Sequence, residues 1–517
     1  MNALKAALIH GTKTAHTPDS LVEQLRGEPG VTCLHSAFFD SAQAHYSFVA
    51  ARPFLTFQSF GSRCELSTRE QVQVQFGNPW HLLDSLMSRY ELLEQADLPF
   101  PLGGCFGYWG YDLKNFVEPK LPRRAINDLE LPDCHVGFYD SLVVFDHRLG
   151  KTWIVSTGLG VDGSRSEKRA NKRLEFWQAR LASEGMRPFP SNVVAADVRR
   201  LMLKKKEVRA SSSRRAGLLR DQPGQGAGSI SSNLTRPEFL MRVERAQEYI
   251  RAGDIYQVNL SQRLAAPLHC SNWELFQRLI AVSPAPFSAY LDCGDFQIAS
   301  SSPELFLRLS ESHIQTRPIK GTRPRSADST RDAQLTYELQ TSPKEMAELV
   351  MITDLLRNDL GKVCEFGSVQ VPELVRLERF PQVQHLVSTI EGRLRSGVTH
   401  FSALASCFPG GSVTGAPKFR AMEIIDELEP VTRGPYTGAL GYLGFNRESQ
   451  LSIIIRAAIC KDGAAYFHAG AGIVADSVPA AEYDETLAKA RGFFEALNVR
   501  PQPEMGMESA NYARHLR

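Results

Sequence analysis

Two pairs of glutamates in this sequence have the spacing of a helix face. Glu345 and Glu348 form one pair, Glu482 and Glu485 form the other, and each pair follows closely after a proline. Residues three apart lie one above the other on a helix, so each pair presents its two carboxylates together. Two such helices side by side would bring four carboxylates into one place, where a hard divalent cation such as Mg²⁺ would relieve their repulsion.

Ordinary structural roles are the alternative for these acids. Carboxylates are common in the first turn of a helix because they interact favourably with the helix dipole. Glu345 also has the position of a capping-box acid after Ser342. Glu485 and Lys489 are four residues apart and suit an exposed ion pair. The spacing by itself leaves both interpretations open.

A lysine accompanied by three arginines is the candidate nucleophile. Lys320 lies in the Pro- and Gly-bounded segment 317–325 together with Arg317, Arg323 and Arg325. A lysine close to other cations loses affinity for its proton and becomes a usable nucleophile at neutral pH. The same cluster would attract an anionic substrate. The alternative is an exposed basic loop.

The candidate general acid is Glu304. It stands directly before the apolar residues Leu305 and Phe306. Burial there would raise the pKa of its carboxyl group, as acid catalysis requires. The alternative is a turn residue capped by the serines that precede it.

Several other residues suit an anionic ligand. Gly470 and Gly472 let a ligand approach the main chain. Residues 408–418 form a Gly-rich loop that lacks the spacing of a nucleotide phosphate loop. Arg456 follows a run of isoleucines, and a buried arginine needs an anionic partner such as a carboxylate. Tyr436 offers a hydroxyl donor, with core packing as its alternative.

These residues must be positioned by a folded body whose sequence has two parts. Residues 233–499 alternate helix patterns with strand patterns and begin with a capping box from Thr235 to Glu238. Residues 1–198 are rich in strand patterns. We expect helices that begin near residues 236, 343 and 479, and strands at 46–50, 141–145, 288–291, 305–307 and 451–455.

Charge is spread unevenly along the chain. The 517 residues carry 59 Lys and Arg against 57 Asp and Glu, a net charge of +2. Between Arg199 and Arg220 nine basic residues accompany one acid, so this stretch carries +8 and the remainder of the chain −6. We expect residues 199–232 to be a flexible insertion rather than a nucleic-acid-binding arm, because no aromatic side chains interleave for stacking. We expect residues 500–517 to be a disordered tail.

The cysteines and the apolar runs exclude several classes of protein. Nine cysteines are scattered without a C-x-x-C pair, which is typical of reduced thiols in the cytoplasm. No apolar run approaches the ~20 residues that span a bilayer. We therefore expect a cytoplasmic globular protein that binds neither membrane nor nucleic acid.

Taken together, these segments resemble the chorismate-utilising enzyme family. The resemblance covers roughly residues 235–497 and, more weakly, the N-terminal part. It implies an α+β fold in which two large β-sheets pack as a sandwich with helices on the outside. The motifs that carry it are residues 256–260, Ser302-Pro303-Glu304, Lys320-Gly321-Thr322, residues 354–360, His385, residues 415–418 and the segment from Glu482 to Thr486.

The resemblance also implies a role for each candidate residue. Lys320 would attack C2 of chorismate while Glu304 protonates the departing C4 hydroxyl. Mg²⁺ would bind through Glu348 and Glu485, with Glu345 and Glu482 acting directly or through water. The residues that would bind the substrate are Thr322, His385, Gly415, Tyr436, Arg456, Gly470, Gly472 and Lys489.

Two positions distinguish the reactions within this family. Members that add ammonia at C2 usually carry alanine where this chain has Lys320. Members that hydrate chorismate usually carry a lysine where this chain has Gln257. The combination implies amination at C4, giving 4-amino-4-deoxychorismate for 4-aminobenzoate and folate biosynthesis. The alternative is amination at C2, for tryptophan biosynthesis.

A glutamine amidotransferase subunit usually supplies the ammonia in such enzymes. Residues 103–107 faintly resemble a nucleophile elbow around Cys105, but none of the 13 histidines is followed two residues later by Glu. Cys105 is better interpreted as a small buried residue in a glycine turn. A separate amidotransferase partner is therefore implied.

Some family members hold tryptophan in a pocket of the N-terminal β-sandwich. Residues 34–39 and the segment from Tyr46 to Phe48 loosely match that region. Ser36 and Tyr46 are the candidate tryptophan-binding residues.

Overall fold

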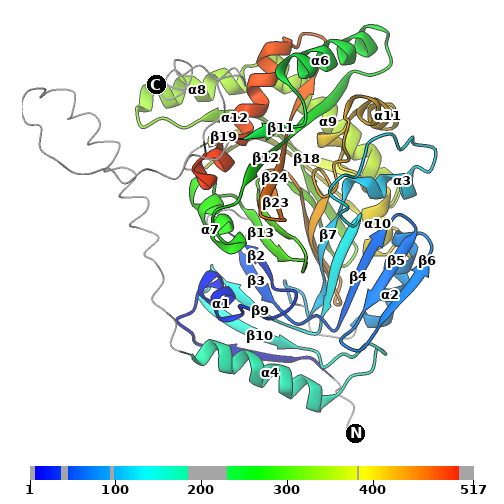
Figure 1. Cartoon of the computed structure of the whole chain (residues 1–517), viewed down its shortest axis with the longest axis vertical. Helices are drawn as coiled ribbons and strands as arrows, with labels where there is room; N and C mark the ends of the chain where they lie inside the picture. Colours follow the sequence, from blue (N-terminus) through cyan, green and yellow to red (C-terminus); the bar gives the residue numbers. More distant parts are fainter. Residues whose placement is uncertain (1–5, 37–44, 93–97, 184–229, 381–382, 500–517) are drawn as a thin grey trace, which may run out of the picture.

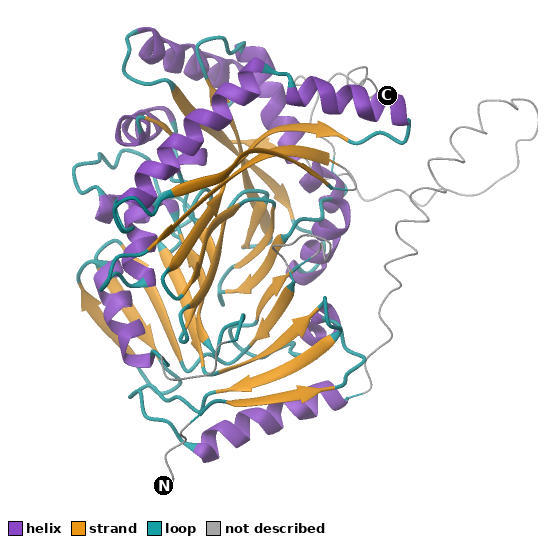
Figure 2. Cartoon of the chain, turned by 180° about the vertical axis from the view of Figure 1, so that it is seen from behind, coloured by secondary structure: helices purple, strands orange, loops and turns teal. Residues whose placement is uncertain are grey.

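The computed structural model describes residues 6–36, 45–92, 98–183, 230–380 and 383–499. These residues form two large antiparallel sheets of 12 strands each, with helices on their outer sides (Figures 1 and 2). The predicted α+β class with two large sheets is therefore confirmed. Of the predicted insertion at residues 199–232, residues 199–229 lie outside the described residues, and so does the predicted tail at 500–517; Ser231–Ser232 form a short strand rather than part of a flexible segment.

The first sheet contains strands from both parts of the sequence. Strand β2 of the N-terminal part pairs with β13 of the C-terminal part, with Leu34 opposite Ala289. In spatial order the strands are β1 (Leu8–Thr12), β10 (Lys151–Ser156), β9 (Ser141–Asp146), β3 (Tyr46–Ala50), β2 (Thr32–His35), β13 (Phe287–Asp292), β14 (Gln297–Ser302), β23 (Ala457–Lys461), β24 (Ala464–Ile473), β12 (Gln257–Pro267) and β11 (Ser231–Ser232), and β20 (Gly415–Ala416) pairs with β12.

The second sheet is built in the same way. Here β7 of the N-terminal part pairs with β21 of the C-terminal part, with Tyr108 opposite Leu440. In spatial order the strands are β17 (Ile319–Pro324), β19 (Val383–Arg393), β16 (His313–Arg317), β15 (Leu305–Ser310), β22 (Glu448–Ile453), β21 (Ala439–Gly444), β7 (Gly104–Trp109), β8 (Cys134–Tyr139), β4 (Leu55–Phe60), β5 (Arg63–Ser67) and β6 (Val72–Phe76), and β18 (Gln370–Arg379) pairs with β19.

Helices cover the outer faces of the sheets. Figure 1 shows α4 along β9 and β10 at one end of the molecule and α12 over β24 at the other. The helices are α1 (Pro18–Gln24), α2 (Pro79–Tyr90), α3 (Lys114–Val117), α4 (Glu167–Ala182), α6 (Arg236–Arg251), α7 (Asn272–Val282), α8 (Ser329–Gln340), α9 (Pro343–Gly361), α10 (His400–Cys407), α11 (Lys418–Leu428) and α12 (Pro479–Leu497), with short 3₁₀ turns at Tyr111–Leu113 and Gly411–Val413. Among the described residues, none of these helices combines the length and the apolar character needed to cross a membrane.

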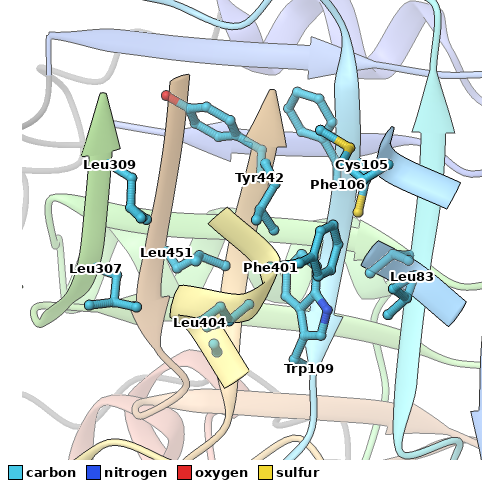
Figure 3. Close-up of a cluster of buried hydrophobic side chains, with 14 of the residues drawn as sticks. Leu83, Cys105, Phe106, Trp109, Leu307, Leu309, Phe401, Leu404, Tyr442 and Leu451 are labelled. Atoms are coloured by element: carbon cyan, nitrogen blue, oxygen red, sulfur yellow. The ribbon is translucent and has the colours of Figure 1, made fainter. Parts of the chain in front are cut away.

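The largest hydrophobic core joins the two parts of the sequence. In Figure 3, Phe401 and Leu404 of α10 pack over the second sheet against Trp109 and Leu451. Trp109 comes from the N-terminal part and Leu451 from the C-terminal part, and both are fully buried. The strands are therefore held together both by pairing and by a shared core.

Most predicted element positions are confirmed. The strands expected at 46–50, 141–145, 288–291 and 305–307 correspond to β3, β9, β13 and β15, and α6 begins with the complete capping box of Thr235 and Glu238. The strand expected at 451–455 ends earlier, at Ile453. The chain turns there and places Arg456 in the left-handed region, with φ +54°.

Candidate active site

Most of the predicted site residues line one cavity of about 600 Å³, a volume suited to a small ligand. Its walls come from β12 and β24 of the first sheet, β17 and β19 of the second sheet, and helices α9 and α12. Segments 230 residues apart in the sequence, from Asn259 to Lys489, thus contribute to one site. The predicted residues that line it are Glu304, Lys320, Thr322, Glu345, Glu348, His385, Tyr436, Arg456, Gly470, Gly472, Glu485 and Lys489.

Two predicted residues do not line this cavity. Gly415 has φ +145° and lies against the main chain of Gln257, where an added Cβ would come within 2.2 Å of the carbonyl oxygen. Its conformation therefore serves the packing of β20 against β12. Glu482 is buried on α12 and accepts a hydrogen bond of 2.6 Å from the hydroxyl of Ser477.

A bulge in β17 displays Lys320. The register between β17 and β19 shifts between Lys320 and Thr322, and Gly321 between them has φ +66°. A side chain at Gly321 would meet Leu339 at 2.7 Å and the Glu345 carboxylate at 3.1 Å. Glycine is therefore required here both for the backbone conformation and for the close contact with two helices.

The surroundings of Lys320 differ from the sequence-based expectation. Each nearby arginine is paired with a carboxylate, so its charge is compensated locally. Lys320 itself has no ion pair or side-chain hydrogen bond within the part of the chain that the structure describes, and the charged groups that act on it are Glu304, Glu348 and Glu485. The arginine pairs are Arg317 with Glu378 (2.7 Å), Arg323 with Glu345 (3.3 Å) and Arg325 with Asp332 (2.9 Å).

Glu304 has the environment of a general acid. Its side chain is only 6 % exposed, and this burial raises the pKa of the carboxyl group. A hydrogen bond from Ser412 and the charges of Lys320 and Lys489 lower the pKa, but they only partly offset the effect of burial. The raised pKa predicted from the sequence is confirmed.

His385 and Thr322 form a neutral pair on the cavity wall. They lie opposite each other on β19 and β17, and the Thr322 hydroxyl is 2.8 Å from Nδ1 of His385. Burial lowers the pKa of His385 to about 4. The imidazole is therefore uncharged at neutral pH and can contact a ligand as a hydrogen-bonding ring.

Three of the four predicted metal-binding carboxylates face the cavity. Burial raises the pKa of Glu348 and outweighs the opposing charges of Lys320 and Lys344, and the negative charges of Glu345 and Glu485 raise it further. Burial also acts to raise the pKa of Glu485, but the ammonium of Lys489 at 2.7 Å, together with the charges of Lys344 and Lys320, outweighs it, and the net pKa is lowered. The repulsion expected from convergent carboxylates is therefore present.

The same carboxylates suit a partly hydrated Mg²⁺ ion. Within the described ranges, no group of three acidic, His or Cys side chains is arranged to enclose a metal ion. Magnesium does not require such a group, because it is usually held by one or two carboxylates, several waters and an anionic substrate. Glu348 and Glu485 provide that donor set on α9 and α12.

A further part of the cavity wall suits a carboxylate ligand. Burial lowers the pKa of Arg456, and no acceptor within the described part of the chain bonds to its guanidinium. Tyr436 stacks on His468 with ring centroids 4.9 Å apart, and its hydroxyl would be 2.9 Å from a Cβ at Gly470. A Cβ at Gly472 would likewise be 2.9 Å from the Gln257 amide. Glycine is therefore needed at both positions to leave room for the side chains that pack against them.

Three polar residues that line the cavity, Asn259, Ser412 and His468, were given no individual role in the sequence analysis. Asn259 lies two positions after Gln257 on β12, so a period of two places it on the same face and could have identified it. Its side-chain oxygen is buried without a partner within the described residues. Ser412 lies in the Gly-rich loop 408–418 that the sequence marks as a whole, whereas no local pattern marks His468 on β24.

The loop that contains Lys418 has a structural role. The ammonium of Lys418 contacts the carboxylate of Asp359 at 2.5 Å and donates to the carbonyls of Cys407 (3.1 Å) and Pro409 (2.9 Å). It fastens the 408–417 loop to α9. Lys418 therefore lies outside the cavity wall.

A second, smaller cavity contains the predicted tryptophan-binding residues. Ser36 and Tyr46 line a space of about 50 Å³ between β2, β3 and β13 on one side and β15, β21 and β22 on the other. A cavity of this size has to widen to admit an indole ring. Residues 37–44, between Ser36 and Tyr46 in the sequence, lie outside the described residues.

Comparison with known protein families and sequences identifies the family of this chain. The family model described as chorismate binding enzyme matches residues 35–495. The chain belongs to this family. It is 40 % identical over 467 residues to an aminodeoxychorismate synthase component 1 of Klebsiella aerogenes, covering 90 % of this chain and 93 % of the relative. It is 37 % identical over 484 residues to an anthranilate synthase component 1 of Acetivibrio thermocellus, covering 93 % and 92 %.

Solved structures share the fold. Anthranilate synthase component I of Streptococcus pneumoniae superposes with a TM-score of 0.70 at 29 % identity, covering 95 % of this chain and all of that one. The menaquinone-specific isochorismate synthase of Escherichia coli superposes with a TM-score of 0.66 at 18 % identity, covering 96 % and 95 %. Family membership and the two-sheet architecture are therefore established together.

Proposed function

We propose that the protein is aminodeoxychorismate synthase component 1, which aminates chorismate at C4. The observation that carries the proposal is Lys320, which lines the cavity with Glu304 and has no ion-pair partner within the described residues. Relatives named aminodeoxychorismate synthase component 1 and anthranilate synthase component 1 are similarly identical to this chain, at 40 % and 37 %. The names of the relatives therefore do not decide whether chorismate is aminated at C4 or at C2. A lysine at this position favours amination of chorismate at C4 over amination at C2.

Binding of chorismate is the first step of the proposed mechanism. Arg456 and Tyr436 would hold one carboxylate, together with the main chain at Gly470. Glu348 and Glu485 would hold Mg²⁺ near the ring carboxylate. When bound, the ion supplies Lewis-acid polarisation of that group.

The chemistry then proceeds through an adduct on Lys320. After Lys320 has released its proton to solvent, its amine forms a bond to C2, both ring double bonds shift by one position, and the C4–O bond breaks as Glu304 gives its proton to the leaving oxygen, releasing water. Ammonia then bonds to C4, both double bonds shift back, and the C2–N bond breaks to free the lysine as an amine. The Glu304 carboxylate takes the surplus proton from the new amine, so both residues return to their starting state.

Product identification tests this function. Purified protein is supplied with chorismate, Mg²⁺ and ammonium, and we expect 4-amino-4-deoxychorismate by mass spectrometry. Fluorescent anthranilate as the main product would instead support amination at C2 and overturn the proposal. In Lys320→Ala, the mass-detectable adduct at that site should be absent, whereas an adduct in the variant would exclude a nucleophilic role for Lys320.

We further propose that a separate glutamine amidotransferase supplies ammonia in the cytoplasm. Cys105 cannot serve as an amidotransferase nucleophile, because it is fully buried and burial raises the pKa of its thiol well above the ordinary value. The relatives are named component 1, which favours a second component. Glutamine should support the reaction only when an amidotransferase is added, and activity with glutamine alone would contradict the two-subunit proposal.

Tryptophan binding beside Ser36 and Tyr46 is a separate proposal. Its support is a cavity between the two sheets that both residues line. Calorimetric titration of the protein with tryptophan should give measurable heat. The absence of both heat and copurified tryptophan would exclude it.

A further inference from the structure

A buried ion pair lies directly behind the cavity wall. Arg433 is only 2 % exposed, and its guanidinium donates to both carboxylate oxygens of Glu429 at 2.7 and 2.8 Å. Neither residue lines the cavity. The pair is therefore shielded from ligand and solvent by the residues around it.

Arg433 uses its remaining donors on segments that form the wall. It donates to the carbonyl of Asn259 on β12 at 2.7 Å, to the carbonyl of Val413 at 3.1 Å and to the hydroxyl of Thr437 at 3.2 Å. Its guanidinium also lies 5.6 Å from the ring centroid of Tyr436. One side chain thus contacts three separate chain segments.

Each of these segments carries a residue of the site. Asn259 and Val413 line the cavity themselves, and Tyr436 directly precedes Thr437. Ser412, next to Val413, donates the hydrogen bond that Glu304 accepts. The position of Arg433 therefore bears on both the ligand-binding tyrosine and the orientation of the general acid.

Glu429 extends the same network to the next position of β12. Its carboxylate accepts from the main-chain N–H of Ser261 at 2.8 Å and from the Ser261 hydroxyl at 2.9 Å. Buried ion pairs add little net stability compared with apolar residues of the same size, because desolvation is costly. Several directional hydrogen bonds nevertheless fix the relative positions of the groups that they join.

We propose that Arg433 and Glu429 are a positioning pair that sets the arrangement of Tyr436, Asn259 and the Ser412 loop, and thereby the affinity for the substrate carboxylate. The proposal rests on the proposed function for the identity of the substrate. It concerns residues that touch no ligand and act only through the cavity wall.

Arg433→Lys tests the pair while keeping its positive charge. Lysine can retain Glu429 but cannot hold Glu429, Asn259, Val413 and Thr437 simultaneously. With ammonia as donor, we expect KM for chorismate to rise about tenfold with a smaller change in kcat, and the dissociation constant of chorismate measured by calorimetry to rise in parallel.

The matched control is Arg173→Lys. Arg173 is also largely buried and pairs with buried Asp140 at 3.0 Å, but it lies on α4 at the end of the molecule opposite α12 (Figure 1). Both variants are compared by thermal unfolding. Equal chorismate affinity of the two variants at equal stability would overturn the proposal.

A milder variant covers the case in which Arg433→Lys does not fold. Ser261→Ala removes one hydrogen bond to Glu429 and leaves the main-chain bond, so we expect a two- to threefold rise in the chorismate dissociation constant. An unchanged constant would overturn the proposal. Calorimetry measures chorismate binding and does not depend on which product forms. A wild-type protein that binds chorismate but makes anthranilate would therefore contradict the proposed function and leave the inference about Arg433 and Glu429 unaffected.

Discussion

At the scale of single residues, the site combines buried carboxyl groups with a lysine among them. Glu304 is held in a largely buried position, and its pKa is raised mainly by loss of solvation. The Ser412 hydrogen bond and the charge of Lys320 counteract that effect. An acid that stays protonated above its ordinary range can deliver a proton to a leaving hydroxyl at a physiological pH.

The first prediction concerns this proton. Glu304 is active when protonated, so activity that depends on it is present below its raised pKa and is lost as the pH rises through that value. Glu304→Gln cannot donate a proton and should lower kcat by about 10²–10⁴-fold. It should also remove the limb of the kcat–pH profile that belongs to Glu304. A variant that keeps the limb of the wild-type profile would assign it to another group.

The second prediction concerns the bulge that displays Lys320. Gly321→Ala places a Cβ 2.7 Å from Leu339 in a left-handed conformation, so we expect loss of stability and loss of the Lys320 adduct. Gly253→Ala is the control, because Gly253 has φ +82° and nothing lies within 4 Å of the added Cβ. Both variants carry a left-handed backbone cost of about 1–2 kcal/mol. A larger loss of thermal stability, and loss of the adduct by mass spectrometry, in Gly321→Ala alone would therefore report the clash with Leu339. Equal behaviour of the two variants would show that the contact has no effect.

At the scale of elements, helices α9 and α12 bring acids from distant parts of the chain to one cavity. Their starts could be predicted from prolines and capping signals, and the i, i+3 spacing correctly brought both acids of α9, Glu345 and Glu348, to the cavity. Which acid of a pair faces the ligand could not be predicted, because it depends on how the helix is rotated against the sheets. Glu485 faces the cavity whereas Glu482 bonds to Ser477.

The third prediction follows from this arrangement. Glu348→Gln should raise the Mg²⁺ concentration needed for half-maximal activity at least tenfold, because a neutral amide is a weaker ligand than a carboxylate. The thermal stabilisation by Mg²⁺ together with chorismate should shrink in parallel. Glu495→Gln is the control, since Glu495 on α12 pairs at the surface with Arg491 at 2.8 Å. An unchanged Mg²⁺ dependence of Glu348→Gln would remove this residue from the metal site.

The arginines around Lys320 show where sequence reasoning fails. Their cluster is evident in the sequence, but their partners Glu378, Glu345 and Asp332 are 61, 22 and 7 residues away. Charge compensation is decided by strand pairing and helix packing, which local patterns do not specify. The electrostatics of the lysine therefore had to come from the structure, whereas its presence in the site could be predicted.

At the scale of the whole molecule, the two parts of the sequence are one folded unit. Strand β2 pairs with β13 in one sheet and β7 pairs with β21 in the other, so each sheet crosses the boundary between the parts. The largest core also contains residues of both, such as Trp109 and Leu451. The change in composition at residues 199–232 does not divide the fold, because strands from before and after it pair with each other in both sheets.

The fourth prediction tests this unity. A fragment that begins at residue 230 loses the partners of β13 and β21, which leaves two long unpaired strand edges and half of the main core exposed to water. We expect no cooperative unfolding transition and weak near-ultraviolet circular dichroism from the fragment alone. In contrast, the full chain cut at a protease site engineered between residues 199 and 228 should stay together on a sizing column and keep its activity with ammonia, because both sheets hold the pieces. A fragment that unfolds cooperatively by itself would show that the catalytic part is an independent domain.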